Sequence, residues 1–137
     1  MGVILDSSVV IAAERRKTTV SALTRHITER IGDQDAALSA VGFTELVHAL
    51  HRASDSAIRE RHRAFLAEIA AGFLVLPYTR ETAYLAGRVD GQERARGFVI
   101  PIIDLMIGAT ALEQGYAVVT VNLRHFRMIP GLNVIAL

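Results

Sequence analysis

Short runs of consecutive apolar residues recur along the chain, and longer stretches with an apolar residue at every third or fourth position separate them. A run without polar residues is typical of a strand that is buried on both faces of a parallel sheet. Such runs predict strands at residues 3–5 and 73–76. The largely apolar stretches 37–40 and 116–121 predict two more strands, and 133–136 predicts an edge strand.

The intervening stretches have the spacing of amphipathic helices. They predict helices at residues 7–16, 18–31, 42–52, 56–71, 80–95 and 101–114, and a loop at 122–131. Gly72 and Gly115 stand where two of these helices are expected to end. Short strands that alternate with helices indicate an α/β fold. We expect a three-layer α/β/α structure with a central parallel sheet of about five strands.

Composition narrows the class of protein. A chain of 137 residues is expected to form a single domain, residues 1–137, that folds without disulfides or a structural metal. The absence of cysteine excludes disulfides, thiolate zinc sites and a cysteine nucleophile. No apolar stretch reaches the roughly 20 residues that cross a bilayer, and no basic segment precedes the first apolar run as in a signal peptide. We therefore expect a soluble, cytoplasmic protein with no membrane partner.

The net charge of +1 is too small to attract nucleic acid through a field of the whole molecule. Basic residues nevertheless gather locally in three runs. Most such runs are solvated helix faces or loops. The three runs are 14–17, 59–63 and 124–127.

An acid follows directly on the first predicted strand. Asp6 comes after Val3-Ile4-Leu5 and before the hydroxyl residues Ser7 and Ser8. One interpretation is a helix cap, and the other is a metal ligand at the carboxyl edge of the sheet, where α/β proteins bind ligands. Asn122 follows the last internal strand, so parallel neighbouring strands would place it at the same edge as Asp6.

Two further acids stand in unusual surroundings. Asp104 interrupts the apolar run 102–107, and its helical neighbours are apolar, which makes an unpaired carboxylate costly there. It also lies in the first helical turn after Pro101, where the helix dipole favours an anion. Glu45 alone reads as a solvated glutamate, although Gly42 and Ala49 on its side of the helix leave room for a close approach.

Several other kinds of site lack part of their sequence pattern. Glu45-x-x-His48 resembles a di-iron motif, but that site needs two copies and four helices. The glycine fingerprint of dinucleotide binding, the phosphate-binding Walker motif and the Gly-x-Ser-x-Gly elbow are absent. Dehalogenase-type phosphatases need a second Asp where Ser8 stands, and a receiver-like phosphoacceptor needs an acidic pair before its phosphorylated Asp.

Five short segments, taken in their order and spacing, resemble PIN-domain proteins and more narrowly the VapC-type toxins of bacterial toxin–antitoxin pairs. The resemblance covers nearly the whole chain. The segments are Ile4-Leu5-Asp6-Ser7-Ser8, Thr44-Glu45-Leu46, the run 102–111, the run 119–126 with its Thr120-x-Asn122-x-x-x-Phe126 pattern, and Ile129-Pro130-Gly131-Leu132.

The resemblance implies a catalytic site in which Asp6, Glu45 and Asp104 converge and ligate a metal ion. Carboxylate oxygens with several retained waters suit Mg²⁺ or Mn²⁺. Asn122 falls where many PIN nucleases carry a fourth acid, which puts the second metal in doubt more than the first. Ser8, and more weakly Thr120, fall where small polar residues support the site.

The implied activity is that of a metal-dependent endoribonuclease, which hydrolyses RNA phosphodiesters with the 3′-hydroxyl as leaving group. The implied partners are RNA, a VapB-like antitoxin and a second copy of the toxin in a homodimer. A PIN fold that only binds a partner and has weak or no catalysis stays open as an alternative. Five basic residues are candidates for RNA binding beside the pocket: Arg15, Arg16, Lys17, Arg124 and Arg127.

Overall fold

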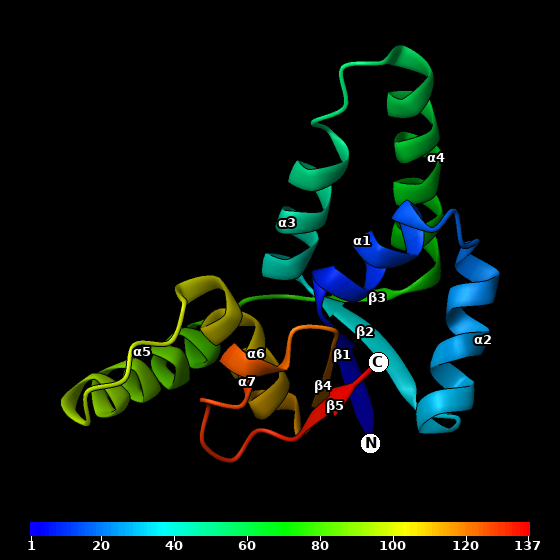
Figure 1. Ribbon diagram of the computed structural model, residues 1–137. Helices are drawn as coiled ribbons and strands as arrows, with labels where there is room; N and C mark the ends of the chain where they lie inside the picture. Colours follow the sequence, from blue (N-terminus) through cyan, green and yellow to red (C-terminus); the bar gives the residue numbers. More distant parts are fainter.

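The computed structural model describes all residues, 1–137, and is built around a five-stranded sheet (Figure 1). All four neighbouring strand pairs are parallel, and the strand order is β3-β2-β1-β4-β5. Each connection between parallel strands therefore crosses over through helices, as the alternating pattern predicts. The strands are β1 (Gly2–Leu5), β2 (Asp35–Ser39), β3 (Leu74–Leu76), β4 (Ala117–Thr120) and β5 (Val134–Ala136).

Seven helices connect and flank the strands. They are α1 (Ser7–Arg15), α2 (Val20–Ile31), α3 (Ala40–Leu50), α4 (Ser56–Gly72), α5 (Arg80–Ala95), α6 (Ile102–Gln114) and α7 (Leu123–Phe126). The six longer helices confirm the sequence prediction to within a few residues. The prediction of a loop throughout 122–131 is wrong, because α7 lies within it. Four residues make about one helical turn, which is too short to show a period in the sequence.

Two helix ends illustrate how local chemistry sets the boundaries. Ser39 ends β2 and caps α3, because its hydroxyl oxygen accepts a hydrogen bond from Gly42 N–H at 2.9 Å. The expected strand over 37–40 is therefore shifted toward the N-terminus and ends one residue earlier. Gly115 ends α6 in the left-handed conformation with φ of 68°, as expected for a glycine cap.

Both faces of the sheet are buried, which makes three layers. Val3 and Leu5 of β1 pack in one hydrophobic core with residues of α1, α2, α3 and α4. Ile4 points to the other face and packs in a second core with residues of α5, α6 and α7. This alternation along one strand explains why its sequence is apolar throughout.

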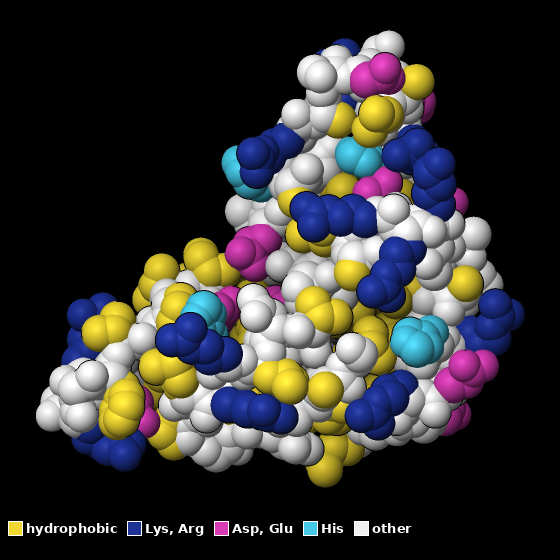
Figure 2. All heavy atoms as spheres, in the orientation of Figure 1, with side chains coloured by type: hydrophobic (Ala, Val, Ile, Leu, Met, Phe, Trp, Pro, Cys, Tyr) yellow, Lys and Arg dark blue, Asp and Glu magenta, His cyan; other side chains and the backbone are white.

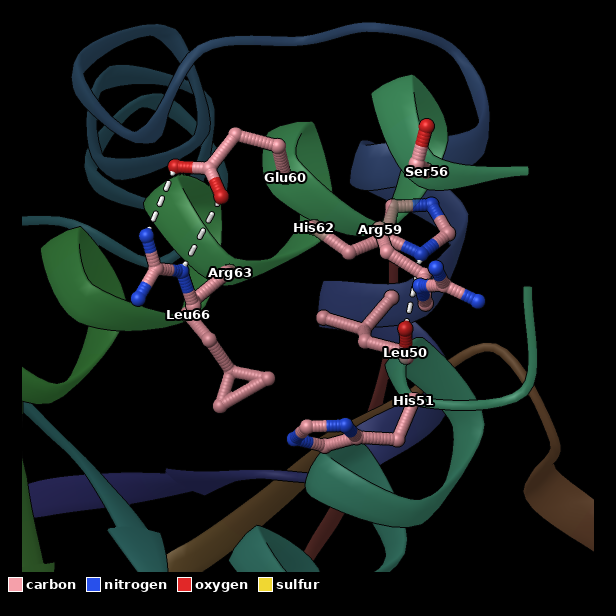
Figure 3. A pocket seen from close by; sticks show the side chains of 8 residues that line it. All are labelled: Leu50, His51, Ser56, Arg59, Glu60, His62, Arg63 and Leu66. Carbon is pink, nitrogen blue, oxygen red and sulfur yellow. Dashed lines mark hydrogen bonds and ion pairs between the residues drawn. The ribbon is translucent and has the colours of Figure 1, made fainter. Parts of the chain in front are cut away.

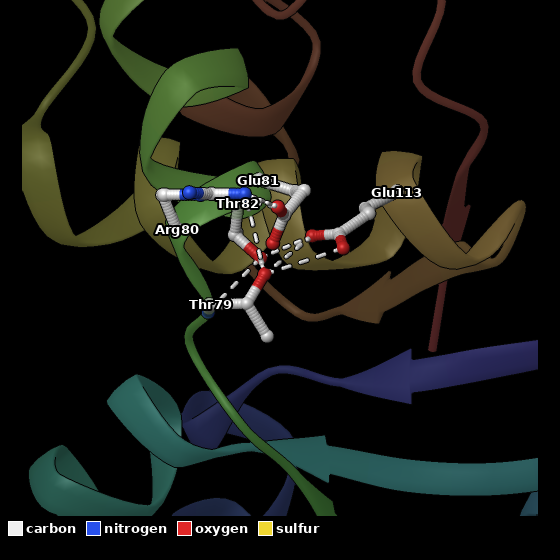
Figure 4. A network of polar contacts seen from close by, with 5 residues as sticks. All are labelled: Thr79, Arg80, Glu81, Thr82 and Glu113. Atoms are coloured by element: carbon white, nitrogen blue, oxygen red, sulfur yellow. Dashed lines mark hydrogen bonds and ion pairs between the residues drawn. The ribbon is translucent and has the colours of Figure 1, made fainter.

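A polar network at the start of α5 stabilises the helical layer that contains α5 and α6 (Figure 4). The Thr79 hydroxyl oxygen accepts a hydrogen bond from Thr82 N–H at 3.2 Å, and the Thr82 hydroxyl oxygen accepts one from Thr79 N–H at 3.3 Å, which makes a capping box. Both hydroxyls also donate to the carboxylate of Glu113 near the end of α6. These bonds hold α5 against α6, the helix that carries Asp104.

The helices extend beyond the sheet in two directions (Figure 1). The α3–α4 hairpin projects as an arm on one side, and α5 and α6 extend on the other. The space-filling view is hollowed between these two parts, and acidic side chains lie at the base of the hollow (Figure 2). No helix is both long and apolar enough to cross a membrane.

Candidate active site

Asp6 lies at the carboxyl end of the central strand β1. The register pairs Leu5 with Val119, and Asp6 N–H donates to the carbonyl oxygen of Val119 at 2.9 Å. The side chain of Asp6 is only 4% exposed. Its Oδ2 accepts hydrogen bonds from the hydroxyl groups of Ser8 at 2.6 Å and Thr120 at 2.9 Å. The two predicted supporting residues therefore fix the orientation of this carboxylate.

The helix-cap interpretation of Asp6 holds for its backbone but not for its side chain. Asp6 occupies the N-cap position of α1, yet its carboxylate makes no capping hydrogen bond. Burial raises the pKa of Asp6 above its usual value, the bonds from Ser8 and Thr120 oppose this, and the charge of Asp104 raises the pKa further. The carboxylate is thus kept in the site at an energetic cost.

Glu45 reaches the same site from α3. Its Oε1 accepts a hydrogen bond from the Ser7 hydroxyl at 2.9 Å. Burial raises the pKa of Glu45, the bond from Ser7 opposes the rise, and the charges of Asp6 and Asp104 add to it. Glu45 is therefore not the freely solvated glutamate that its sequence context suggests.

Asp104 lies in the first turn of α6 and comes from the opposite layer. Its Oδ2 is 2.8 Å from Nδ1 of His125 on α7. The side chains of Asp104 and His125 are 22% and 34% exposed, so the pair lies at the surface of the hollow. The expected carboxylate on an apolar helix face therefore has a histidine partner.

Asn122 lies at the same edge of the sheet as Asp6, as the parallel-strand argument predicts. Its backbone N–H donates to the Thr120 hydroxyl at 2.9 Å, but its exposed side chain makes no hydrogen bond with the three carboxylates. The backbone of Asn122 thus positions Thr120, which in turn positions Asp6.

The three carboxylates influence one another electrostatically and repel any further anion unless a cation is present. No three acidic or histidine side chains are grouped closely enough to hold one ion in common. Mg²⁺ is commonly bound by one or two carboxylates, with waters and substrate oxygens completing its shell. The carboxylates therefore suit an ion that keeps several waters, and they do not form a site made of protein ligands alone.

The five predicted RNA-binding residues are all exposed and do not form one surface. Arg15, Arg16 and Lys17 each line a different cavity. Arg124 lies on α7 and Arg127 follows it, beside the hollow's histidine. Their role in RNA binding stays a prediction.

Two residues of the site could not be identified from the sequence. In the sequence Ser7 is only one of two hydroxyl residues after Asp6, whereas in the structure it bonds to Glu45, 38 positions away. His125 belongs to a basic run that reads as a solvated surface, whereas it contacts Asp104 across 21 positions. A run of hydroxyl or basic residues gives no indication of such distant partners.

Comparison with known proteins places this geometry in a family. The sequence model of the PIN domain matches residues 3–131. The chain belongs to the PIN-domain family. This PIN domain is 31% identical over 135 residues to the ribonuclease VapC of Rickettsia bellii, and 30% identical to the ribonuclease VapC1 of Rickettsia felis. Each alignment covers 98% of this chain and 96% of the relative.

A third relative and two solved structures agree with this assignment. The tRNA(fMet)-specific endonuclease VapC of Salmonella typhimurium is 29% identical over 118 residues, with 85% of this chain and 87% of the relative covered. VapBC-5 of Mycobacterium tuberculosis superposes with a TM-score of 0.75 at 27% identity, over 99% and 98% of the two chains. VapBC2 of Rickettsia felis gives 0.85 at 17% identity, over 100% and 99%, which supports the fold.

Proposed function

We propose that this PIN domain is a metal-dependent endoribonuclease toxin that hydrolyses RNA phosphodiesters and is neutralised by a VapB-like antitoxin. The observation that carries the proposal is a buried Asp6 at the carboxyl end of β1, oriented by Ser8 and Thr120, in a chain that matches the PIN-domain model over residues 3–131. The VapC relatives, whose names denote ribonucleases and a tRNA-specific endonuclease, support RNA as the substrate class.

Asp6, Asp104 and Glu45 would hold Mg²⁺ or Mn²⁺, with one or two of these carboxylates as direct ligands and waters completing the shell. Such an ion polarises a phosphodiester, lowers the pKa of an attacking water and stabilises the leaving oxygen. The fit rests on hard oxygen donors, on their mutual repulsion and on the raised pKa of Asp6 and Glu45. Waters and oxygens of the RNA would complete the coordination shell of such an ion.

The protein's own contribution is orientation. Ser8 and Thr120 both donate to one oxygen of Asp6, and the second oxygen accepts no side-chain hydrogen bond. Ser7 fixes Glu45 in the same way through one oxygen. Partners that orient ligating carboxylates matter for affinity, because a ligand held in place loses little freedom on binding.

His125 acts as a positioning residue for Asp104 in this proposal. Its contact with Oδ2 at 2.8 Å leaves Oδ1 of Asp104 for other partners. In metal sites, residues that hydrogen-bond to a metal ligand orient that ligand toward the ion. His125 would orient Asp104 in this way.

Mapping of RNA ends tests the activity, the site and the substrate together. Total RNA would be sequenced at its ends after controlled expression of the wild type and of Asp104→Asn, with Asp33→Asn in an exposed turn as the matched control. We expect new ends for the wild type and the control, and none for Asp104→Asn. New ends of equal abundance for Asp104→Asn would contradict the assigned site.

The proposed assembly follows the relatives. Several solved structures with this fold are VapBC complexes, which supports a VapB-like partner for this chain. We further propose that the toxin forms a homodimer and acts on RNA in the cytoplasm. Co-expression with a VapB-like antitoxin is expected to relieve growth arrest, and arrest that persists with the antitoxin bound would count against neutralisation.

The alternative is a catalytically weak PIN module that only binds its partner. The observation in its favour is that Asn122 stands in place of a fourth acid and makes no side-chain bond to the site. Calorimetric titration with Mn²⁺ separates the two. Heat of binding that disappears in Asp6→Asn supports the enzyme, and no heat at millimolar Mn²⁺ supports the binding module.

A further inference from the structure

A basic cavity of about 540 Å³ lies between α1, α3 and the start of α4. Its wall includes three arginines: Arg15 at the end of α1, Arg52 in the turn after α3, and Arg61 on α4. Arg15 and Arg52 form no ion pair in the structure, so their charges face the solvent of the cavity. Lys and Arg side chains gather over this part of the surface, above the acidic hollow (Figure 2).

Helices α1 and α3 contact each other at the candidate active site and both extend from there to the cavity. Ser7 of α1 bonds to Glu45 of α3 there. One turn further along these helices, Ile11 and Ala49 line the cavity. Arg15 follows at the end of α1, about 12 Å beyond Ser7 at 1.5 Å per residue, and Arg52 follows in the turn after α3. An extended strand seated at the carboxylates would pass over them.

The one carboxylate in the cavity wall is already paired with other side chains of the wall. Glu14 is only 7% exposed, and its Oε1 lies 3.0 Å from Nε2 of His62 and 3.6 Å from Nε of Arg61. Nδ1 of His62 also donates to the Leu50 carbonyl oxygen at 2.8 Å, which anchors the ring. With Glu14 occupied inside the wall, the open part of the cavity keeps an excess of positive charge.

We propose that this cavity binds phosphate groups of the RNA strand next to the scissile bond. The inference rests on the proposed ribonuclease function and adds a substrate subsite to it. The guanidinium groups of Arg15 and Arg52, which have no ion-pair partner, suit phosphate oxygens, because each presents a planar set of donors with a permanent charge. An RNA strand that contacts both the carboxylates and the arginines would therefore run along the α3–α4 arm.

A second cavity on the same arm provides a comparison (Figure 3). Arg59 and Arg63 line it from another face of α4, and Arg63 bonds to Glu60 through two nitrogens. No residue of α1 lines this second cavity, so it does not continue the line from Ser7 and Glu45. It has a similar number of arginines, and for that reason it supplies matched controls.

Equilibrium binding of RNA tests the proposal apart from cleavage. Anisotropy of a short fluorescein-labelled single-stranded RNA would be measured at several salt concentrations, in an Asp6→Asn background with intact RNA verified on a gel. We expect Arg15→Ala/Arg52→Ala to bind about tenfold more weakly. The slope of log affinity against log salt should fall by about 1.4, since each lost phosphate contact on a single strand contributes about 0.7. Arg15→Lys/Arg52→Lys should retain the slope.

The control Arg59→Ala/Arg63→Ala removes the same charge and should leave both affinity and slope near the parent values. Equal weakening by the two double variants would overturn the proposal, because net charge alone would then explain binding. It would also be overturned if Arg15→Ala/Arg52→Ala lost binding to poly-glutamate but not to RNA, since the cavity would then suit an acidic protein segment. Circular dichroism confirms that each variant is folded.

The outcomes separate this inference from the function on which it rests. If the wild type cleaves RNA with Mn²⁺ and the arginine variants bind RNA normally, only the subsite is wrong. If the wild type cleaves no RNA under any metal condition, the proposed function itself fails, whatever the arginines contribute to binding.

Discussion

Asp6 is a single residue that serves the candidate site but lowers the stability of the folded protein. A carboxylate that is 4% exposed loses most of its hydration, and a second acid nearby increases the cost. Two hydroxyl groups recover part of that cost and at the same time fix the direction of the side chain. A bound cation would recover more.

Asp6→Asn is therefore expected to stabilise the metal-free protein at neutral pH while it abolishes RNA cleavage. The folded-state pKa of Asp6 lies above its unfolded value of 3.8, so the folded state binds the proton more tightly. The contribution of Asp6 to stability thus falls as the pH rises through this interval, and the advantage of Asp6→Asn should grow from about pH 4 toward neutral pH. Urea unfolding in EDTA across this range measures it. An advantage that shrinks as the pH rises would contradict the prediction.

Thr120 allows a test of orientation without a change of charge. Its side chain is fully buried and donates to Asp6 at 2.9 Å, so Thr120→Val removes the bond but keeps the volume. We expect a 10–100-fold loss of Mn²⁺ affinity or of activity, as for other partners of metal ligands. Thr110→Val is the matched control, because Thr110 is equally buried and donates only to the Met106 carbonyl oxygen of its own helix. An equal loss in both variants would mean that packing rather than orientation is responsible.

A site residue could be predicted from its local context only where its type is unusual among its neighbours in the sequence. Asp6 and Asp104 were detectable because each is an acid within an apolar run. Glu45 was identified only through the family resemblance, since its own context suggests a solvated residue. Ser7 and His125 could not be found, because their contacts with Glu45 and Asp104 join distant segments of the chain.

At the scale of elements, the prediction succeeded where a period extends over several turns or where a run is wholly apolar. The six longer helices meet the first condition and β1, β3 and β5 the second, whereas β2 and β4 are largely apolar with a polar residue at the end of the strand. The short helix α7 meets neither. Its placement matters for function, because α7 carries His125 to Asp104.

The packing of α6 against the segment after α7 can be tested at Gly108. A Cβ atom there would clash with Cδ1 of Ile129 and lie 3.2 Å from Cδ2 of Leu132, and Ile129 is itself only 2% exposed. We expect Gly108→Ala to destabilise the fold by about 1–2 kcal/mol, because overpacking outweighs the better helix propensity of alanine.

Gly91→Ala on α5 is the control for this substitution, since no atom lies within 4 Å of its added Cβ. It should stabilise the protein by up to about 1 kcal/mol through helix propensity alone. Thermal unfolding of both variants measures the difference. If Gly108→Ala were as stable as Gly91→Ala, the close contact between α6 and Ile129 would not exist in solution.

The whole molecule joins two hydrophobic cores across one sheet, and the site lies where the two layers meet. Asp6 and Glu45 come from elements that pack on the first core, whereas Asp104 comes from a helix of the second. The sequence predicts this architecture in outline, because strands that are apolar throughout require helices on both faces. The hollow between the two parts depends on how far the α3–α4 and α5–α6 helices extend past the sheet, which no local pattern specifies.

A cation shared by carboxylates from both layers should stabilise the molecule as a whole rather than one element. Binding to the folded state alone adds about 2.7 kcal/mol at a metal concentration 100 times the Kd. We therefore expect Mn²⁺ and Mg²⁺ to raise the Tm of the wild type by several degrees in a single calorimetric transition. Asp6→Asn, Glu45→Gln and Asp104→Asn should each reduce the rise, and Asp33→Asn should retain it. Loss of the rise in only one of the three would limit the site to that carboxylate, whereas an unchanged rise in all three would move the metal elsewhere in the protein.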